Sequence, residues 1–173
     1  MIVIKTNRFI LRPFQKGDEQ SLVKNINNKK IYEATLRIPY PYRLQDANKY
    51  IDKCLKVILQ NKPKSLSLAI EIDQQVVGGI GLDHIEKHQA ELGYWLGENY
   101  WGKGIITEAA KLLTEFGFKK LGLARIYAYV YPSNKASMRV LQKNGFTREG
   151  FLRKNVIKKG RLLDSYLFAK VVG

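Results

Sequence analysis

Two glycines that flank a lysine, Gly102-Lys103-Gly104, are the first candidate for chemistry in this sequence. Apolar residues follow them at helical spacing, so the loop would lie at the amino terminus of a helix. Unpaired backbone N–H groups and the positive end of the helix dipole make such a loop suitable for a phosphate or pyrophosphate, and the glycines let the backbone approach it. By itself, however, Gly-x-Gly before a helix is more often a simple tight turn.

Two nucleotide-binding motifs do not fit this loop. A P-loop requires Ser or Thr directly after Gly-Lys and a glycine five residues before the lysine, but Gly104 follows Lys103 and Glu98 stands at the earlier position. A dinucleotide-binding fingerprint requires a third glycine where Thr107 stands. Neither class of nucleotide site is therefore indicated.

Few other residues could do chemistry. The single cysteine, Cys54, cannot form an internal disulfide and falls on the apolar face of an expected helix, so we interpret it as a core residue. His84 and His88 lie in or near a polar loop and are expected in solvent, with a substrate contact as the alternative for His84. One cysteine and two histidines are too few for a typical structural zinc site, and we expect no metal.

Length and charge limit the class of protein. A chain of 173 residues is near the usual size of one domain, and we expect a single domain over 1–173. The net charge of +15 is scattered along the chain, which suits either plain solubility or an anionic ligand with an acidic or ribosome-associated partner. No apolar run approaches the roughly 18 residues of a membrane span, and no signal peptide is seen, so a cytoplasmic location is expected.

Hydrophobic periodicity predicts the elements that position the loop. Asp18 is a plausible N-cap for a first helix, Asn134 opens the last one, and Gly145 ends it in the left-handed conformation. We expect strands over 2–14, 66–72, 76–82, 90–96, 125–130, 146–152 and 162–171, and the main helices over 45–60 and 105–120. Short turns join the middle strands, so the fold class is α/β (α+β), a mixed and mostly antiparallel sheet flanked by helices.

In this setting the loop resembles the acetyl-CoA-binding motif of the GNAT superfamily of N-acetyltransferases, a Gln/Arg-x-x-Gly-x-Gly loop at the start of a long helix. Asn99 replaces the first residue of that motif. Residues 134–146 look like the family's Asn-x-x-Ser…Leu-x-x-x-Gly-Phe segment, and residues 6–12 and 91–96 resemble the RimJ/RimL branch, which acetylates the amino termini of ribosomal proteins. The resemblance implies a sheet of six to seven strands with a splayed central pair, between which the pantetheine arm lies.

The resemblance also implies site residues. Main-chain groups of Tyr94, Trp95 and Leu96 would bind pantetheine, and Asn134 would hydrogen-bond the cofactor from the other side. The pyrophosphate would be held by Trp101, Gly102, Lys103, Gly104, Ile105, Ile106 and Thr107.

Two catalytic roles are expected. Glu91 matches a catalytic glutamate of several family members and would act as general base, the alternative being a strand carboxylate paired with a lysine or arginine. Many relatives protonate the departing CoA thiolate from a tyrosine where this chain has Leu141. Ser137 is the expected substitute, and a helix cap is the alternative for it. Asp164 is expected to pair with a basic neighbour. Tyr32, Tyr40 and Tyr42 would line the acceptor pocket or belong to the core.

The implied reaction is acetyl transfer from acetyl-CoA to a primary amine in a ternary complex, most simply a protein N-terminal amine. A small-molecule amine acetyltransferase and a non-catalytic basic RNA- or ribosome-binding module are the alternatives. The acceptor could be an acidic or ribosomal protein, nucleic acid is not required, and a monomer and a homodimer both remain open.

Overall fold

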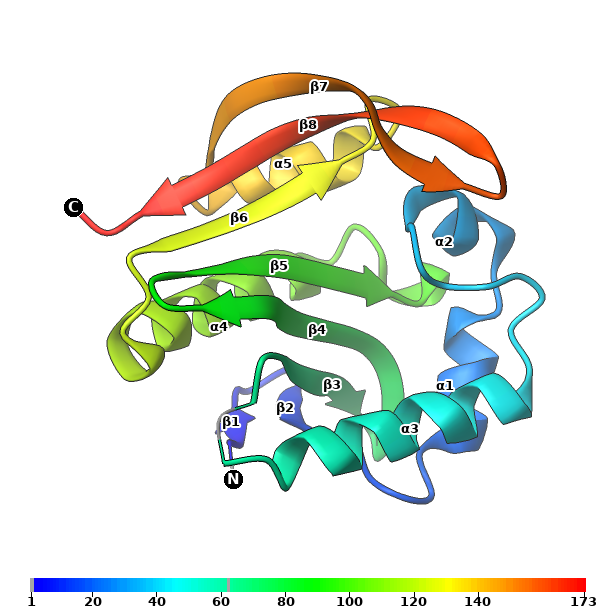
Figure 1. The fold of residues 1–173 in the computed structure, drawn as a ribbon. Coiled ribbons are helices and arrows are strands. Elements are labelled where there is room, and N and C mark those ends of the chain that lie inside the picture. The colour runs from blue at the N-terminus through cyan, green and yellow to red at the C-terminus, as the bar shows by residue number, and fades with distance from the viewer. Residues whose placement is uncertain (1, 62) are drawn as a thin grey trace.

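Residues 2–61 and 63–173, which the computed structural model describes, form an eight-stranded sheet with helices on both faces (Figure 1). The strand order is β1-β2-β3-β4-β5-β6-β8-β7. The strands are β1 (Ile4–Lys5), β2 (Ile10–Pro13), β3 (Leu66–Ile72), β4 (Gln75–Glu86), β5 (Gln89–Leu96), β6 (Arg125–Val130), β7 (Thr147–Lys158) and β8 (Arg161–Val171). The helices are α1 (Glu19–Ile26), α2 (Lys29–Ala34), α3 (Leu44–Ile58), η1 (Glu98–Tyr100, a 3-10 turn), α4 (Ile105–Leu121) and α5 (Lys135–Lys143).

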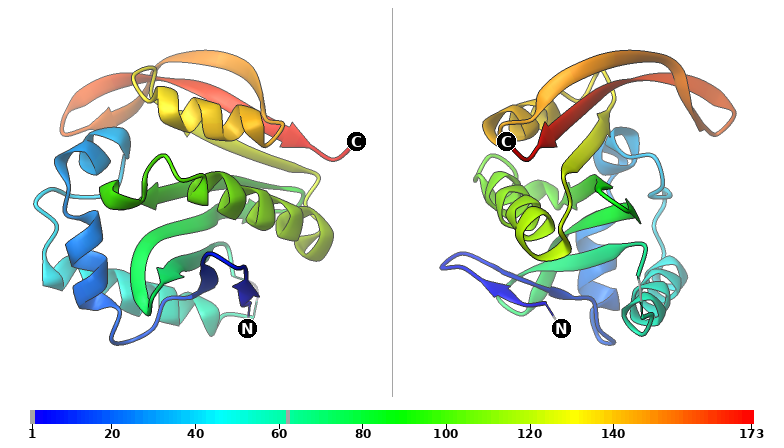
Figure 2. Two further views of the ribbon diagram at one scale, coloured as in Figure 1. Left: turned by 180° about the vertical axis from the view of Figure 1, so that it is seen from behind. Right: turned by 60° about the vertical axis from the view of Figure 1, so that its left-hand side comes forward.

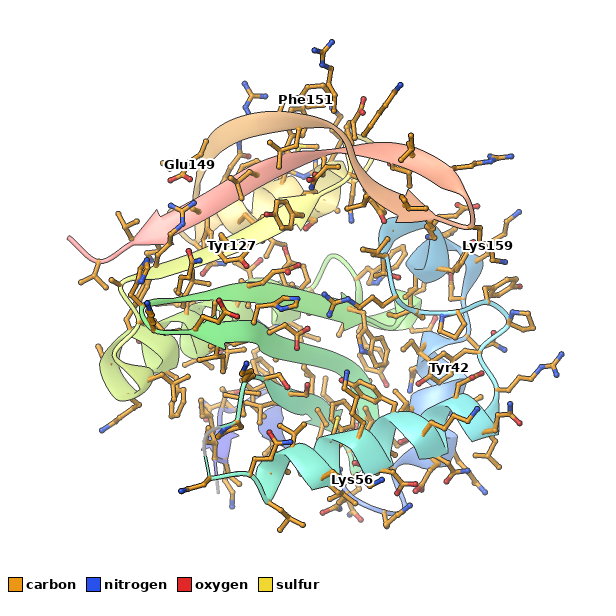
Figure 3. All side chains as sticks on the ribbon, in the orientation of Figure 1. Tyr42, Lys56, Tyr127, Glu149, Phe151 and Lys159 are labelled. Atoms are coloured by element: carbon orange, nitrogen blue, oxygen red, sulfur yellow. The ribbon has the colours of Figure 1, made fainter. Side chains whose placement is uncertain are left out.

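The two faces of the sheet carry separate cores. Helices α1 and α3 lie in front of the sheet in Figure 1, and α4 and α5 come to the front when it is seen from behind (Figure 2). Side chains fill the space between α3 and the sheet (Figure 3), where Phe14, Leu22 and Ile51 are almost fully buried. Leu113 of α4 and Leu141 of α5 are fully buried on the opposite face. Cys54 is buried in the α3 core, as the apolar pattern of that helix predicts.

The central pair β5 and β6 is the only parallel neighbour pair in the described sheet. Their register covers Gln89–Glu91 opposite Arg125–Tyr127 and then ends, although β5 continues to Leu96 and β6 to Val130. The two strands therefore separate towards their carboxyl ends. This confirms the splayed pair and the mixed, mostly antiparallel sheet, which has eight strands where six to seven were expected.

One additional strand comes from the amino terminus, where a single strand over 2–14 was predicted. The chain instead turns at Thr6, whose hydroxyl accepts hydrogen bonds from the backbone N–H groups of Arg8 at 3.1 Å and Phe9 at 3.0 Å. The turn lets β1 pair back on β2, with Ile4 opposite Leu11. A polar side chain that hydrogen-bonds the neighbouring backbone favours a turn. The apolar residues before and after Thr6 alternate as in a strand, so the sequence pattern did not reveal this turn.

Asp18 stands at the N-cap position of α1, but its side chain does not cap the helix. Its backbone is already near-helical, with φ −76° and ψ −16°, and its two carboxylate oxygens accept from Arg12 at 2.8 Å each. The backbone N–H of Gln15 donates to the same carboxylate at 2.9 Å. A buried charge requires pairing, so the nearby arginine takes the carboxylate away from the helix end.

Several other strand and helix boundaries differ from the predicted ones. Strand β4 extends four residues past its predicted end through an irregular register between Asp83 and Glu86, and β7 continues to Lys158 with a similar break between Leu152 and Val156. Bulges interrupt the period of two by which strands are recognised. The short helix α2 was not predicted, because six residues carry too little periodicity. Gly145 has φ +77°, as predicted for the residue that ends α5.

Candidate active site

The glycine loop ends where α4 begins. Gly102 and Gly104 have φ of +74° and +75°, and Gly104 is the N-cap residue of α4. The first helical hydrogen bond runs from the N–H of Glu108 to the carbonyl of Gly104 at 3.1 Å. The N–H groups of Ile105, Ile106 and Thr107 therefore lack helical partners and point out of the helix end. The loop has the anion-binding geometry expected from the sequence.

Arg8 braces this loop from the opposite end of the chain, a role that the sequence did not indicate. Its guanidinium donates to the carbonyl of Lys103 and forms an ion pair with Glu108 at 3.3 Å. The Lys103 ammonium lies 5.6 Å from the centre of the Tyr100 ring, within range of a cation–π contact. Two positive charges, the Arg8 guanidinium and the Lys103 ammonium, therefore lie at the loop.

The splay between β5 and β6 leaves part of the β5 backbone without a partner strand. The Gly97 N–H donates to Val77 of β4, whereas the His88 carbonyl accepts from the residues that lead into β6. The main-chain N–H and C=O groups of successive residues in a strand point in opposite directions. Those of the even-numbered residues of β5 therefore point toward β6, and those of the odd-numbered residues point toward β4.

Tyr94 and Leu96 therefore direct main-chain groups into the gap, and Trp95 does not. Trp95 lies two residues before Gly97, whose N–H donates to Val77 of β4, so the Trp95 main chain points toward β4 and not toward the gap in which its pantetheine contact was expected. The carbonyl of Leu96 accepts a hydrogen bond from the indole of Trp101 at 2.7 Å, so its N–H is the group that remains for a ligand.

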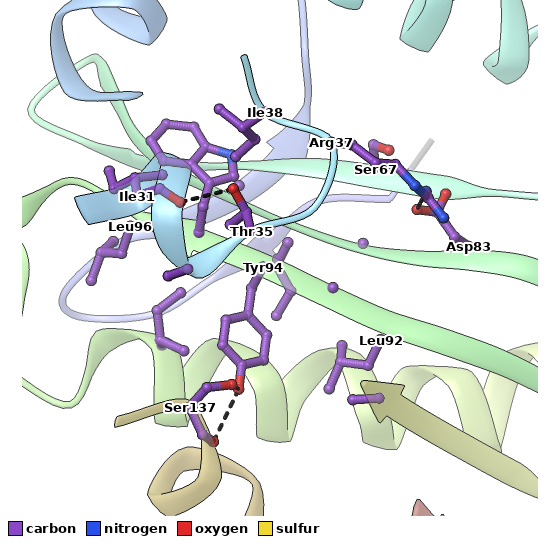
Figure 4. A pocket seen from close by; sticks show the side chains of 18 of the residues that line it. Ile31, Thr35, Arg37, Ile38, Ser67, Asp83, Leu92, Tyr94, Leu96 and Ser137 are labelled. Atoms are coloured by element: carbon purple, nitrogen blue, oxygen red, sulfur yellow. Dashed lines mark hydrogen bonds and ion pairs between the residues drawn. The ribbon is translucent and has the colours of Figure 1, made fainter. Parts of the chain in front are cut away.

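A cavity of about 1140 Å³ connects the loop with the other face of the sheet (Figure 4). Gly102, Gly104 and the first turn of α4 line one end, and Tyr94, Asn134 and Ser137 line the middle. The far end is lined by Glu91, Asp83 and the segment 34–39 that follows α2. Pockets for one drug-sized ligand have about 300–1,000 Å³, so this cavity has room for two substrates together.

Asn134 opens α5 as the sequence indicates, and the cap alternative for Ser137 is wrong. The Asn134 side-chain oxygen accepts from the Ser137 N–H at 3.0 Å, so Asn134 is the N-cap and Ser137 is not. The Ser137 hydroxyl oxygen instead lies 2.8 Å from the phenol oxygen of Tyr94 (Figure 4). Burial raises the pKa of Tyr94 to about 12, so this phenol stays protonated at neutral pH. Leu141 is fully buried and offers no polar group.

Glu91 lies at the far end of the cavity, opposite Asp83 on β4. Among the described residues the one ionisable nitrogen within 4 Å of its carboxylate is that of His84, at 3.8 Å, so the alternative of a strand carboxylate paired with a lysine or arginine is not observed. Arg37 bonds Asp83 at 3.0 Å and lies 3.2 Å from the His84 ring. Burial raises the pKa of Glu91, partly offset by Arg37 and His84. A carboxylate with no lysine or arginine in direct contact and with a raised pKa suits a general base.

The three tyrosines near α2 have separate environments. Tyr42 is buried and lines the cavity, whereas Tyr32 and Tyr40 are not among its described lining residues. The ammonium nitrogen of Lys158 lies over the Tyr32 ring, 3.9 Å from the centre of that ring. Lys158 also donates to the carbonyls of Tyr32 and of Thr35, the latter at 2.7 Å, and so ties the β7–β8 hairpin to the segment that walls the cavity.

Asp164, the expected ion-pair residue of the last hairpin, does not line the cavity. Asp164 accepts a hydrogen bond from the backbone N–H of Lys154 at 2.8 Å and forms no ion pair in the described chain, which corrects the expected pairing. Within residues 2–61 and 63–173, no group of three or more His, Cys, Asp or Glu side chains could hold a metal ion. None of the described helices is long and apolar enough to cross a membrane.

Comparison with known proteins agrees with this geometry. Residues 8–147 match the sequence profile of the acetyltransferase (GNAT) domain. An uncharacterized N-acetyltransferase of Bacillus licheniformis, p20, is 32% identical over 171 residues, which cover 98% of this chain and 96% of that protein.

Two solved structures share the fold. RimL, a ribosomal L7/L12 α-N-protein acetyltransferase in complex with CoA, superposes with a TM-score of 0.87 at 22% identity, covering 99% of this chain and 98% of its own. The microcin C7 self-immunity acetyltransferase MccE, in complex with acetyl-CoA and AMP, superposes with a TM-score of 0.83 at 27% identity. The match covers 96% of this chain and 94% of the MccE chain. The resemblance found in the sequence is confirmed. The chain belongs to the GNAT family of acetyltransferases, whose acyl donor is acetyl-CoA.

Proposed function

We propose that this acetyltransferase moves the acetyl group directly from acetyl-CoA to a protein N-terminal amine while both substrates are bound. The observation that carries the proposal is the continuous cavity, which joins the anion-binding loop at Gly102 to the carboxylate of Glu91. Two substrates that meet in one cavity need no covalent enzyme intermediate, because proximity alone lowers the barrier.

The donor would occupy the loop end. The N–H groups of Ile105 to Thr107 would bind the pyrophosphate, with Lys103 adding charge. The main chain of Tyr94 and the N–H of Leu96 would bind the pantetheine arm. The amide NH2 of Asn134 donates to no described protein atom, since the cap uses only its oxygen, and it would donate to the cofactor.

The acceptor would occupy the Glu91 end. Asp83 and Glu91 favour a cationic amine there, although Arg37 neutralises part of their charge. Glu91 would take one proton from the amine, directly or through water. The neutral nitrogen would then attack the thioester carbonyl carbon, and the carbon–sulfur bond would break with its electron pair going to sulfur. The second proton of the nitrogen would pass to water, which leaves a neutral amide and a CoA thiolate. The Ser137 hydroxyl would donate a hydrogen bond to the thiolate.

Two properties favour an N-terminal amine as acceptor. An α-amino group has a pKa of about 8, against about 10.4 for a lysine side chain, so a carboxylate base suffices to deprotonate it. The wall of the acceptor end is largely apolar, through Ile31, Ile38 and Trp95, and would take the first side chain of a peptide. The net charge of +15 would attract an acidic protein. RimL, which shares the fold, is named as an α-N-protein acetyltransferase of ribosomal L7/L12.

A small-molecule amine is the second candidate. It is favoured by the similarity to the spermidine N(1)-acetyltransferase of Escherichia coli, which is named for a small amine and is 28% identical over 145 residues, covering 82% of this chain and 74% of that protein.

A thiol-release assay across acceptor classes tests the proposal. The panel holds peptides with free amino termini, the same peptides with blocked amino termini and an internal lysine, small amines, and purified ribosomal proteins. We expect release with free amino termini, and mass spectrometry should place the acetyl group on the α-nitrogen. Release only with small amines supports the second candidate. Binding of acetyl-CoA without release on any amine, together with tight and salt-dependent RNA binding, would show a binding module instead.

A further inference from the structure

Tyr94 and Ser137 form a hydroxyl pair inside the cavity, although 43 residues separate them in the chain. The phenol oxygen lies 2.8 Å from the Ser137 hydroxyl oxygen and 3.3 Å from the Ser137 carbonyl oxygen (Figure 4). Tyr94 comes from β5 and packs against the apolar core beneath α4, so its ring is held from the strand side. Ser137 is held from the helix side by the Asn134 cap.

The number of protons limits what this pair can do. Each hydroxyl has one proton to donate and lone pairs with which to accept. In one arrangement the serine donates to the phenol and the phenol donates to the serine carbonyl. In the other the phenol donates to the serine hydroxyl oxygen, and the serine proton is free to point elsewhere. Only the second arrangement lets Ser137 donate a hydrogen bond to a thiolate.

We propose that Tyr94 is a positioning residue for the acetyl transfer, whose phenol donates to the Ser137 hydroxyl oxygen and so directs the serine proton toward the departing thiolate. This inference rests on the proposed function. Negative charge on sulfur favours the second arrangement, because a hydrogen bond to an ionised acceptor is stronger than one between neutral groups. The phenol needs only to turn its proton from the carbonyl to the hydroxyl of the same residue. It thereby supplies from β5 a tyrosine hydroxyl that buried Leu141 on α5 cannot supply.

Steady-state kinetics separate this role from a structural one. Tyr94→Phe keeps the ring and the main chain and removes only the hydroxyl. We expect kcat to fall about tenfold while KM for acetyl-CoA changes by less than about twofold. Ser137→Ala should have a similar effect, and the double variant should be no slower than Ser137→Ala alone. Tyr166→Phe is the matched control, because Tyr166 lies on β8 outside the cavity lining and should retain the wild-type rate.

A second measurement needs no acceptor. The thiol of bound CoA is titrated by the ultraviolet absorbance of its thiolate, in the wild type and in both variants. We expect the wild type to lower the thiol pKa and each variant to raise it again by about one pH unit, the equivalent of a tenfold effect. An unchanged thiol pKa in Tyr94→Phe, a wild-type kcat in that variant, or additive effects in the double variant would overturn the inference and leave the proposed function standing. Failure of the wild-type protein to bind CoA would overturn both.

Discussion

Replacing Gly102 with alanine tests the loop with a single methyl group. Gly102 has φ +74°, and a Cβ atom built on it meets no protein atom within 4 Å. Gly122, at the other end of α4, has φ +66° and is equally free of neighbours. The two substitutions impose a similar backbone strain, one in the loop before α4 and one at its C-cap, but only Gly102 lies where the donor is proposed to bind.

The expected stability cost is therefore the same at both positions. A non-glycine residue in the left-handed region costs about 1–2 kcal/mol, which lowers Tm by about 2–8 °C in a domain of this size. The binding cost is expected at Gly102 alone. If its methyl group displaces the pyrophosphate from one backbone N–H, the loss of a charge-assisted hydrogen bond of about 1.5–3 kcal/mol weakens binding by about ten- to a hundredfold.

Thermal unfolding followed by circular dichroism measures the first effect, and titration calorimetry with CoA measures the second. Gly122→Ala should bind CoA as the wild type does, and Gly102→Ala should bind it at least tenfold more weakly. Equal affinities in the two variants, at equal loss of Tm, would refute the assignment of the anion to this loop.

Three further substitutions test the rest of the site and the fold. Glu91→Gln should reduce kcat/KM most below the amine pKa of about 8 and less above it, because a deprotonated amine needs no base; a pH profile of the ratio checks this, and a constant ratio would exclude Glu91 as the base. Asp18→Ala removes one of the two carboxylates that pair with Arg12, leaving Glu71, and it also removes the acceptor of the Gln15 backbone N–H. Unfolding should therefore become easier by about 1–3 kcal/mol; a loss below about 1 kcal/mol in denaturant titrations would match an exposed ion pair instead. Lys158→Met removes the tether between the β7–β8 hairpin and the wall of the acceptor end, and it should raise KM for the acceptor about threefold or more, with KM for acetyl-CoA unchanged. Arg161→Met, at an exposed position of the same hairpin, provides the control, and equal kinetics in the two variants would contradict the tether.

Local chemistry made much of the site predictable. The glycines of the loop, the helix after it and the Asn134–Gly145 segment depend on interactions within a few residues, such as caps, positive φ and helical periodicity. Caps, positive φ values and helical periodicity can be predicted from the sequence, because each depends on the conformational preference of a residue for its own backbone and that of its near neighbours. The pattern of short-turn strands likewise indicated the antiparallel part of the sheet.

What the sequence alone determined is thus the family, the fold class and the place of the anion-binding loop. Tertiary structure decided which side chains meet. Arg8 reaches Lys103 across 95 residues, Arg37 reaches Asp83 across 46, and Tyr94 reaches Ser137 across 43. It also decided that the Trp95 main chain faces β4 rather than the gap, as the hydrogen bond from Gly97 to Val77 indicates. The physical reason is that strand register and helix packing set these contacts, and hydrophobic periodicity reports which face of an element is buried without reporting its partner.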